Sequence, residues 1–424
     1  MDAVHPDSIA IIKSTAPVLA VHGNTITTLF YNTMIAENSS LNNIFSTTSQ
    51  TTGRQPRALA GAVLAYATYI DDLPKLTHAI ERIAHKHASL QVTPAQYDIV
   101  GKYLMQAIGQ VLGAAATAEI VDAWTAAYGF LASVFIGREA DLYKSQAADG
   151  WLGWRKFRIA KKVPESGNIT SFYLTPSDGV VPLPKFLPGQ YVSLQLPVPS
   201  LGYLQSRQYS LSAAPREKGE TYRISVKREE GQQPLGIKGI ISNMLHDEFS
   251  EGGEVELSHP QGEFVLDPAD KGKEGVPVVL ISAGVGATAL MSILDSLTPS
   301  QEAAVPVKRP VSWIHASWSS ELEPFGEAVR KIAGENENVS ANVFLETLRE
   351  GDKLGVQYQF AESKLDLAKL DQEKDLHVGD SRSEYYLCGS EGFMVEMRRA
   401  LVALGVDKER VYLELFATGD VGDE

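Results

Sequence analysis

The sequence predicts a multidomain protein that joins three architectures: an all-α domain at residues 1–150, an antiparallel β-barrel domain at 151–266 and a doubly wound α/β domain at 267–424. The chain has 424 residues, a length that corresponds to about three domains. Helical spacing runs through the first third, and short strand-like runs between turns fill the middle. An apolar strand, a glycine turn and a helix open the last third.

The composition excludes several classes of protein. A hydrophobic fraction of 44% is that of a globular chain, which argues against wholesale disorder. The single cysteine, Cys388, can form neither an internal disulfide nor a thiolate metal site by itself, and it favours a reducing compartment. No targeting segment is visible, so we expect a cytoplasmic monomer, with a mitochondrial location as the alternative.

The net charge of −14 is spread unevenly along the chain. It is −3 for residues 1–150, +1 for 151–266 and −12 for 267–424. Because nucleic acids and anionic membranes repel acidic proteins, we expect no nucleic acid partner and no stable membrane association. The middle segment has the most basic residues for its length, so a bound diphosphate is sought there first.

The first domain is predicted to be all-α because apolar residues recur at helical spacing and strand-like runs are few. Pro94 after Thr93 marks one helix start. No heptad repeat is present, which excludes a coiled coil. The predicted helices are 8–22, 24–37, 55–70, 73–89, 94–112 and 117–144.

Polar residues on apolar helix faces are the informative positions. His87 continues the stripe of Leu76, Ile80 and Ile83, so it points inward, whereas His85 is expected to face solvent. Taken alone, an inward histidine is more often a hydrogen-bonded core residue than a metal ligand.

Two later helices place a tyrosine and a carboxylate on their core faces, Tyr97 and Glu139. A histidine that binds a metal usually donates its second ring N–H to an oxygen. Glu139 can accept that bond with support from Tyr97, although beside Arg138 it can equally be a surface glutamate. On other helices, Tyr31 and Gln55 can converge on a small ligand, and the alternative for both is ordinary packing.

Three stretches now support a resemblance. LFYNTM (29–34), IAHKHASLQVTPAQYDIVG (83–101) and VFIGREADLY (134–143) resemble the globin domain of the flavohaemoglobins, in the family's order and spacing. The resemblance implies a haem b whose iron is bound by His87, with Tyr97 and Glu139 as its hydrogen-bonded partners. It also implies that Tyr31 and Gln55 lie over bound oxygen. Leu59 would form an apolar wall of the pocket, and Phe45 would pack against the haem.

The middle third alternates with period two at 222–226 and 255–257, and has further strand-like runs at 169–175 and 189–196. Short strands at regular spacing predict an antiparallel barrel. It contains Arg207-Gln208-Tyr209-Ser210 and then a glycine and a serine that open a helix at 239–245, which favours phosphate binding.

Together with Pro188-Gly189-Gln190-Tyr191, these motifs resemble the FAD domain of the ferredoxin–NADP reductase family. The resemblance implies that Arg207 and Ser242 bind the FAD diphosphate, Tyr209 stacks on the flavin and Ser210 bonds near flavin N5. The loop between 230 and 242 is long for the family, so its conformation stays open. The residues assigned to FAD are Tyr191, Arg207, Gln208, Tyr209, Ser210, Ser242 and Phe416.

The last third begins with the apolar run 278–282, followed by a glycine turn and a helix, a pattern that lets backbone approach a diphosphate. Later strand-like runs at 311–317 and 385–389 predict a doubly wound sheet. The order of motifs resembles the family's pyridine-nucleotide domain. This sequence departs from the family pattern at two positions, with Ala289 and Ser390 where proline is usual. The residues assigned to NAD(P) are Gly284, Gly286, Thr288, Cys388 and Gly389.

The resemblance implies a nitric oxide dioxygenase that passes electrons from NAD(P)H to FAD to haem and converts nitric oxide and oxygen to nitrate. A flavin is needed because hydride donors deliver electron pairs and haem iron accepts single electrons. The choice between NADH and NADPH stays open, although the stretch 317–321 lacks basic residues and favours NADH. Two alternatives remain: a haem/flavin reductase acting on a peroxide or quinone, and a haem-based gas sensor.

Overall fold

The computed structural model describes residues 4–216, 218–231, 236–298, 308–355 and 357–416. Within that range the chain forms two compact units. The first unit contains residues up to 154 together with 195–207, and the second contains 155–194 and 208–416. The three predicted architectures are confirmed, whereas the residue boundaries between three domains remain a prediction.

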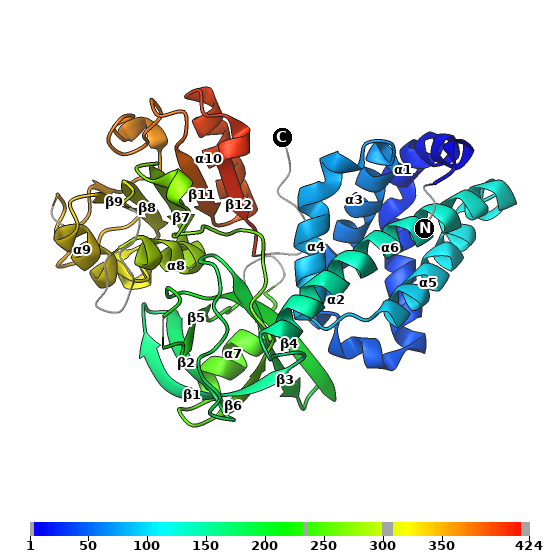
Figure 1. Ribbon diagram of the computed structural model, residues 1–424, viewed down its shortest axis with the longest axis horizontal. Helices are drawn as coiled ribbons and strands as arrows, with labels where there is room; N and C mark the ends of the chain where they lie inside the picture. The colour runs from blue at the N-terminus through cyan, green and yellow to red at the C-terminus, as the bar shows by residue number, and fades with distance from the viewer. Residues whose placement is uncertain (1–3, 217, 232–235, 299–307, 356, 417–424) are drawn as a thin grey trace. The chain divides into compact units, whose positions relative to one another are not determined.

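The first unit is a bundle of helices (Figure 1). Their bounds are α1 (Pro6–Glu37), α2 (Thr47–Thr51), α3 (Arg54–Tyr69), α4 (Thr77–Ser89), α5 (Pro94–Leu112) and α6 (Ala118–Ala148). Thr93 caps α5 with a complete capping box, in which Gln96 bonds back to the cap, and Pro94 occupies the first turn.

Two predicted helices, 8–22 and 24–37, are in fact one continuous helix, α1. The predicted break fell at Gly23, but this glycine is buried inside the helix, where an added Cβ would lie 3.4 Å from Cβ of Ala60 on α3. Gly23 therefore serves close packing of two helices rather than a turn. The prediction also missed α2 and began α4 too early, because 73–76 is a 3-10 turn.

The chain after the helices forms an antiparallel sheet in the order β4-β3-β6-β1-β2-β5, of which residues 195–207 are grouped with the first unit. Leu211, directly after β4, forms an antiparallel bridge with Ile224 of β5, which brings the two ends of the sheet together as a barrel requires. The bounds are β1 (Arg155–Pro164), β2 (Ile169–Pro176), β3 (Tyr191–Val198), β4 (Tyr203–Ser210), β5 (Tyr222–Lys227), β6 (Glu254–Leu257) and helix α7 (Ile240–Asp247).

One barrel lysine supports α7 from its carboxyl end. Lys162 Nζ donates to the carbonyl oxygens of Leu245, His246 and Phe249 at 3.1, 3.2 and 2.6 Å. A cation there also complements the helix dipole. We expect Lys162→Met to lower the free energy of unfolding by about 1–2 kcal/mol in urea titrations. Lys161→Met is the matched control because that neighbouring lysine is exposed, and an equal loss in both variants would contradict the capping role.

The second unit also contains a parallel sheet in the order β10-β9-β8-β7-β11-β12. Met394 of α10 packs in the core on one face of the sheet, and Leu290 of α8 and Val329 of α9 pack in the core on the other, as a doubly wound fold requires. The bounds are β7 (Val278–Ala283), α8 (Ala287–Leu297), β8 (Val311–Ser317), α9 (Gly326–Glu335), β9 (Val339–Leu345), β10 (Phe360–Ala361), β11 (Glu384–Cys388), α10 (Glu391–Ala403) and β12 (Val411–Glu414).

A fully buried histidine in this sheet makes the fold sensitive to acid. His315 of β8 is 0% exposed, and its Nδ1 bonds Ser282 Oγ at 2.8 Å. Burial lowers the pKa of His315 from 6.5 to about 4. The unfolded chain therefore binds a proton first, so stability is present above pH 6.5 and is lost as the pH falls toward 4.

The pKa difference corresponds to about 3 kcal/mol. We expect His315→Gln to lose much less stability than the parent chain between pH 7 and pH 4.5, as measured by urea unfolding at both pH values. The exposed His78 provides the control, since His78→Gln should leave the acid-induced loss unchanged. An equal loss in the parent and His315→Gln would contradict the assignment.

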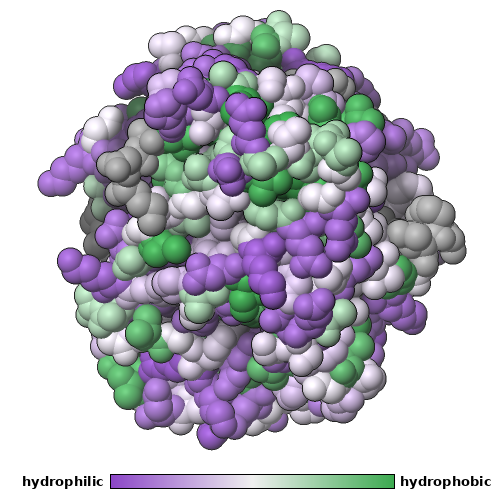
Figure 2. All heavy atoms as spheres, turned by 90° about the vertical axis from the view of Figure 1, so that its right-hand side faces the viewer, coloured by the Kyte–Doolittle hydropathy of each residue, from purple (hydrophilic) through white to green (hydrophobic). Residues whose placement is uncertain are grey.

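Helix α6 is long and apolar enough to cross a bilayer by length and composition. Core helices of globular proteins pass the same test, and α6 contributes Trp124, Ala127 and Phe135 to the buried core of its unit. On the face shown in Figure 2, hydrophobic residues occur in small groups among hydrophilic ones.

Candidate functional site

Three of the predicted site residues meet in one hydrogen-bonded cluster. His87 Nδ1 lies 2.8 Å from Glu139 Oε1 and 2.9 Å from the Tyr97 hydroxyl, and that hydroxyl donates to the same carboxylate oxygen at 2.5 Å. A carboxylate only accepts, so the bond to Glu139 places a proton on Nδ1. The structure records no hydrogen bond from its described residues to Nε2, which therefore keeps its lone pair for a metal.

Burial and the neighbouring Glu139 hold the pKa of the Tyr97 hydroxyl well above its usual range, so Tyr97 remains a donor. The Phe135 ring lies 5.8 Å from the imidazole ring of His87 and stacks on Tyr97. Glu139 is 2% exposed, which excludes the alternative of a surface glutamate.

One expectation about α4 is wrong. His85 was expected to face solvent, yet its side chain is 12% exposed and lies near Glu81, whereas 31% of the His87 side chain is exposed. The periodicity of α4 alone does not reveal that the His85 side chain is this well covered.

A second group forms around Tyr31 on α1. Gln55 of α3 donates to the Tyr31 hydroxyl oxygen at 3.4 Å, and the Phe45 ring meets the Tyr31 ring edge-on at 5.3 Å. Burial raises the pKa of Tyr31 to about 12, so at neutral pH the hydroxyl keeps its proton and can donate it to a ligand. Leu59 packs against the same core. The predicted distal residues are thus neighbours within the first unit.

These residues fit a haem. His87 offers an unprotonated Nε2 whose imidazole is fixed by two oxygen partners, an arrangement typical of metal-binding histidines. The apolar cluster around His87 includes Phe135 and Leu142, while Leu59 and Phe45 pack against the larger core cluster. Haem is a flat apolar macrocycle whose iron takes a nitrogen ligand, so it would suit both the His87 nitrogen and these apolar side chains.

The predicted flavin residues lie on or beside β3, β4 and α7. Ser210 Oγ is buried and has no partner among the described residues, an orphaned hydroxyl that suits a hydrogen bond to flavin. Arg207 donates to Thr48 Oγ1 at 3.3 Å, and Gln208 donates to Ser193 Oγ at 2.8 Å, while Tyr209 makes contacts within the chain.

The remaining flavin residues lie in the second unit. Ser242 is buried in the first turn of α7, and its Oγ accepts from Glu229 N at 3.3 Å. Tyr191 is 9% exposed, whereas Phe416 is 46% exposed and leaves a ring free to cover a flat cofactor. Part of the long loop between 230 and 242 lies outside the described residues.

The glycine turn after β7 has the geometry of a diphosphate cradle. Gly284 has φ +52°, and a Cβ there would meet open space, so the backbone is accessible. A Cβ on Gly286 would lie 2.2 Å from the carbonyl oxygen of Cys388, so only glycine allows this approach to β11. Thr288 donates back to the Val285 carbonyl at 3.0 Å. The glycine spacing thus serves both access and packing.

The other nucleotide-side residues are structural in this state. Burial raises the pKa of the Cys388 thiol well above its usual range, which disfavours thiolate chemistry. Gly389 approaches Phe393, whose ring a Cβ would meet at 2.6 Å. Ser390, where proline is usual, caps α10 by accepting from Phe393 N at 3.4 Å. Ala289 is a fully buried residue of α8 and packs in the core, so neither departure disrupts the turn.

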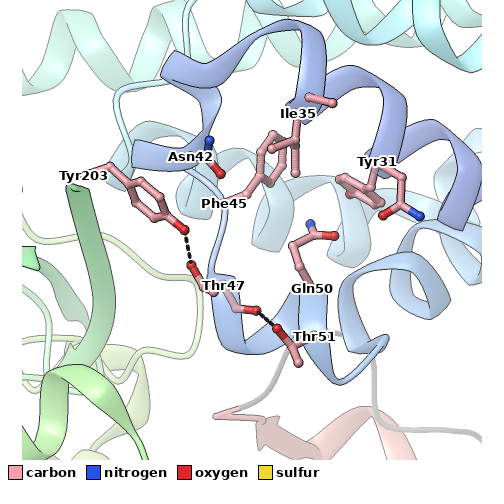
Figure 3. Close-up of a pocket in the computed structure, with 10 residues that line it drawn as sticks. Tyr31, Ile35, Asn42, Phe45, Thr47, Gln50, Thr51 and Tyr203 are labelled. Carbon is pink, nitrogen blue, oxygen red and sulfur yellow. Dashed lines mark hydrogen bonds between the residues drawn. The ribbon is translucent and has the colours of Figure 1, made fainter. Parts of the chain in front are cut away.

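The sequence did not predict a pocket of about 290 Å³ that Tyr31 helps to line (Figure 3). Gln50 Nε2 is buried there without a partner among the described residues, and Tyr203 closes one side through a bond to Thr47 Oγ1 at 3.2 Å. No sequence signal joins residue 203 to 31–51, because the contact spans over 150 positions. The pocket is lined by Tyr31, Asn32, Ile35, Ala36, Asn42, Phe45, Thr47, Gln50, Thr51 and Tyr203.

Comparisons with known proteins agree with this geometry. The globin family matches residues 28–135. A protein described as "Flavohemoprotein" from Bordetella pertussis is 45% identical over 98% of this chain and 99% of its own. A flavohemoglobin from Malassezia yamatoensis, solved with bound FAD and heme, is 29% identical with a TM-score of 0.82 over 98% of this chain and 100% of that one.

A shorter solved structure matches the region after the helical unit. The FAD/NAD binding domain of nitric oxide dioxygenase from Vibrio cholerae is 33% identical with a TM-score of 0.50, over 61% of this chain and 97% of that one. Similarity along almost the whole of both chains requires the same domains in the same order. The chain therefore belongs to the flavohaemoprotein family, oxidoreductases in which a globin is joined to an FAD- and NAD-binding reductase module.

Proposed function

We propose that this chain is an NAD(P)H-dependent nitric oxide dioxygenase that holds haem b and FAD and detoxifies nitric oxide. The observation that carries the proposal is the pair of hydrogen-bonded groups in the first unit, His87 with Glu139 and Tyr97, and Tyr31 with Gln55. The relatives add support, since one similar structure was solved with FAD and heme and another is named a nitric oxide dioxygenase domain.

When bound, haem supplies an iron that takes up oxygen, and FAD divides the electron pair of a hydride into single electrons. The chain's own residues tune this chemistry. His87 Nε2 would bind the haem iron, and Glu139 accepts the hydrogen bond from Nδ1, which makes the imidazole a stronger electron donor. Stronger donation favours oxygen activation over storage.

The Tyr31 hydroxyl would stabilise partial negative charge on an oxygen ligand by donating a hydrogen bond to it. Gln55 Nε2 points at the Tyr31 oxygen and so fixes the direction of that O–H. Because the pKa of Tyr31 is about 12, the donor stays protonated at physiological pH.

In the second unit, Ser242 and the buried Ser210 hydroxyl, which has no partner among the described residues, would hold FAD, and the glycine turn with Gly284 and Gly286 would hold the nicotinamide nucleotide. The family resemblance assigns Arg207 to the FAD diphosphate as well. A carbonyl of β11 lies directly under that turn. This packing keeps the backbone rigid where a diphosphate binds.

The purified protein should show a Soret band together with flavin absorbance, and loss of either would remove its cofactor from the proposal. Reduced anaerobically with NADH and then mixed with oxygen and nitric oxide, it should form one nitrate for each electron delivered. Protein without NADH is the control. Rapid turnover of a quinone or peroxide with no nitrate above buffer autoxidation would replace the dioxygenase by a haem/flavin reductase.

A further inference from the structure

Gln205 stands out among the residues that the proposed function leaves unused. It lies on β4 within the first unit, is 1% exposed, and its carboxamide is fully engaged. Oε1 accepts from Thr47 N at 3.0 Å, and Nε2 donates to the carbonyls of Asn42 and Phe45 at 2.9 and 3.2 Å. One buried side chain thus holds three backbone groups of the loop 42–47.

This loop carries Phe45, which the sequence assigns to the haem pocket. The three bonds fall at Asn42, at Phe45 itself and at Thr47, so they fix the backbone before, at and after this residue. The Phe45 ring in turn lies edge-on to the ring of Tyr31, at 5.3 Å. Figure 3 shows Phe45, Gln50 and Tyr31 directed toward a common pocket.

Neighbouring residues of the same strand reinforce this attachment. Leu204 N donates to Asn43 Oδ1 at 2.8 Å, the Tyr203 hydroxyl bonds Thr47 Oγ1 at 3.2 Å, and Arg207 reaches Thr48. Among these contacts only Gln205 is both fully buried and bonded to three backbone groups. Loss of its amide would take away the partner of one part-buried N–H and of two part-buried carbonyls at once, which costs free energy for each group left unsatisfied.

We propose that Gln205 is a positioning residue for the distal side of the globin, acting through Phe45 on the orientation of Tyr31. The inference rests on the proposed haem site. Gln205 lies in the part of the sequence that resembles the reductase, and the proposal gives it a role in oxygen retention that is separate from FAD binding. A merely structural role predicts a general loss of stability and no selective change at the distal side.

Hydrogen–deuterium exchange of the holoprotein tests the first step without reference to activity. In Gln205→Leu, exchange of the segment 42–48 should rise by about tenfold, because the Thr47 amide loses its acceptor. Gln205→Glu retains that acceptor but turns an anionic oxygen toward two carbonyls, so it should loosen Asn42 and Phe45 while sparing Thr47. Unchanged exchange in both variants would overturn the proposal that Gln205 holds the loop 42–47.

Oxygen dissociation from the reduced protein tests the second step. Gln205→Leu should raise the dissociation rate by about three- to tenfold. The same change made in a Tyr31→Phe background should have little further effect, because the residues act in series. The control is Ser225→Ala, which removes buried hydrogen bonds to Ser171 and Ser212 inside the second unit and should leave the rate unchanged.

The two proposals can fail separately. If Tyr31→Phe speeds oxygen release and Gln205→Leu does not, the positioning role is overturned and the distal role of Tyr31 stands. If neither variant alters the rate, the distal assignment itself fails. Additive effects of the two changes would mean that Gln205 does not act through Tyr31, and would likewise overturn the inference.

Discussion

Tyr31→Phe should raise the rate at which oxygen leaves the reduced protein by about 10- to 100-fold, because a hydrogen bond to a charged or polarised ligand is worth roughly 1.5–3 kcal/mol. The Tyr31 hydroxyl is buried, keeps its proton and accepts a hydrogen bond from Gln55, which orients it toward a ligand. Stopped-flow displacement of oxygen by carbon monoxide measures the rate directly. The oxygen association rate should change less, since the ring that remains fills the same space.

Tyr66→Phe is the matched control. Tyr66 is also a buried tyrosine of the first unit, 3% exposed, with a pKa raised to about 12 by burial. Its hydroxyl donates to the Ala127 carbonyl at 2.9 Å, inside the helical core. This variant should lose stability and keep its oxygen dissociation rate. Equal oxygen dissociation rates in Tyr31→Phe and the parent chain would contradict the distal role.

His87→Gly should abolish axial ligation, and added imidazole should restore it by occupying the space that the side chain leaves. Glu139 and Tyr97 remain to bind the second nitrogen of the imidazole. Adding Glu139→Gln should then weaken imidazole binding by about 10- to 100-fold, the usual effect of removing the partner of a metal-bound histidine. Titration of imidazole followed by the Soret band measures both affinities.

The control for the carboxylate is Glu81→Gln. Glu81 pairs with Arg138 at 2.8 Å and makes no contact with His87 in the recorded hydrogen bonds. It should leave imidazole affinity unchanged in the His87→Gly background. If both glutamate substitutions weaken imidazole to the same extent, a general electrostatic effect rather than the Glu139 bond would be responsible, and the proximal assignment of Glu139 would fall.

Much of the site was predictable because its signals are local. The stripe that ends at His87 and the core faces bearing Tyr97 and Glu139 follow from the periodicity of single helices, and the structure joins all three by hydrogen bonds. The glycine turn at 284–286 was likewise readable from a strand followed by a helix. In each case the residue's own element determines where its side chain points.

The misses concern contacts between distant segments. Gly23 resembles a helix break in the sequence, but in the structure it lies inside α1 where α3 packs closely against it. The low exposure of His85 likewise does not follow from the periodicity of α4. Gln205 lies on β4 just before the predicted flavin residues, yet its own partners are some 160 positions away. Periodicity has no information on such pairs, because they arise only when the chain folds back on itself.

The composition of the first unit has a consequence for how such proteins can be recombined. Residues 195–207 cluster with the helices rather than with the sheet that follows them in sequence. A gene segment that ends at residue 154 would encode every helix of the globin and omit the strand that holds its loop 42–48. The compact unit that contains the proposed haem site is therefore discontinuous in sequence. A recombined chain would have to carry a β4 that fits this loop, so the two segments would have to change together.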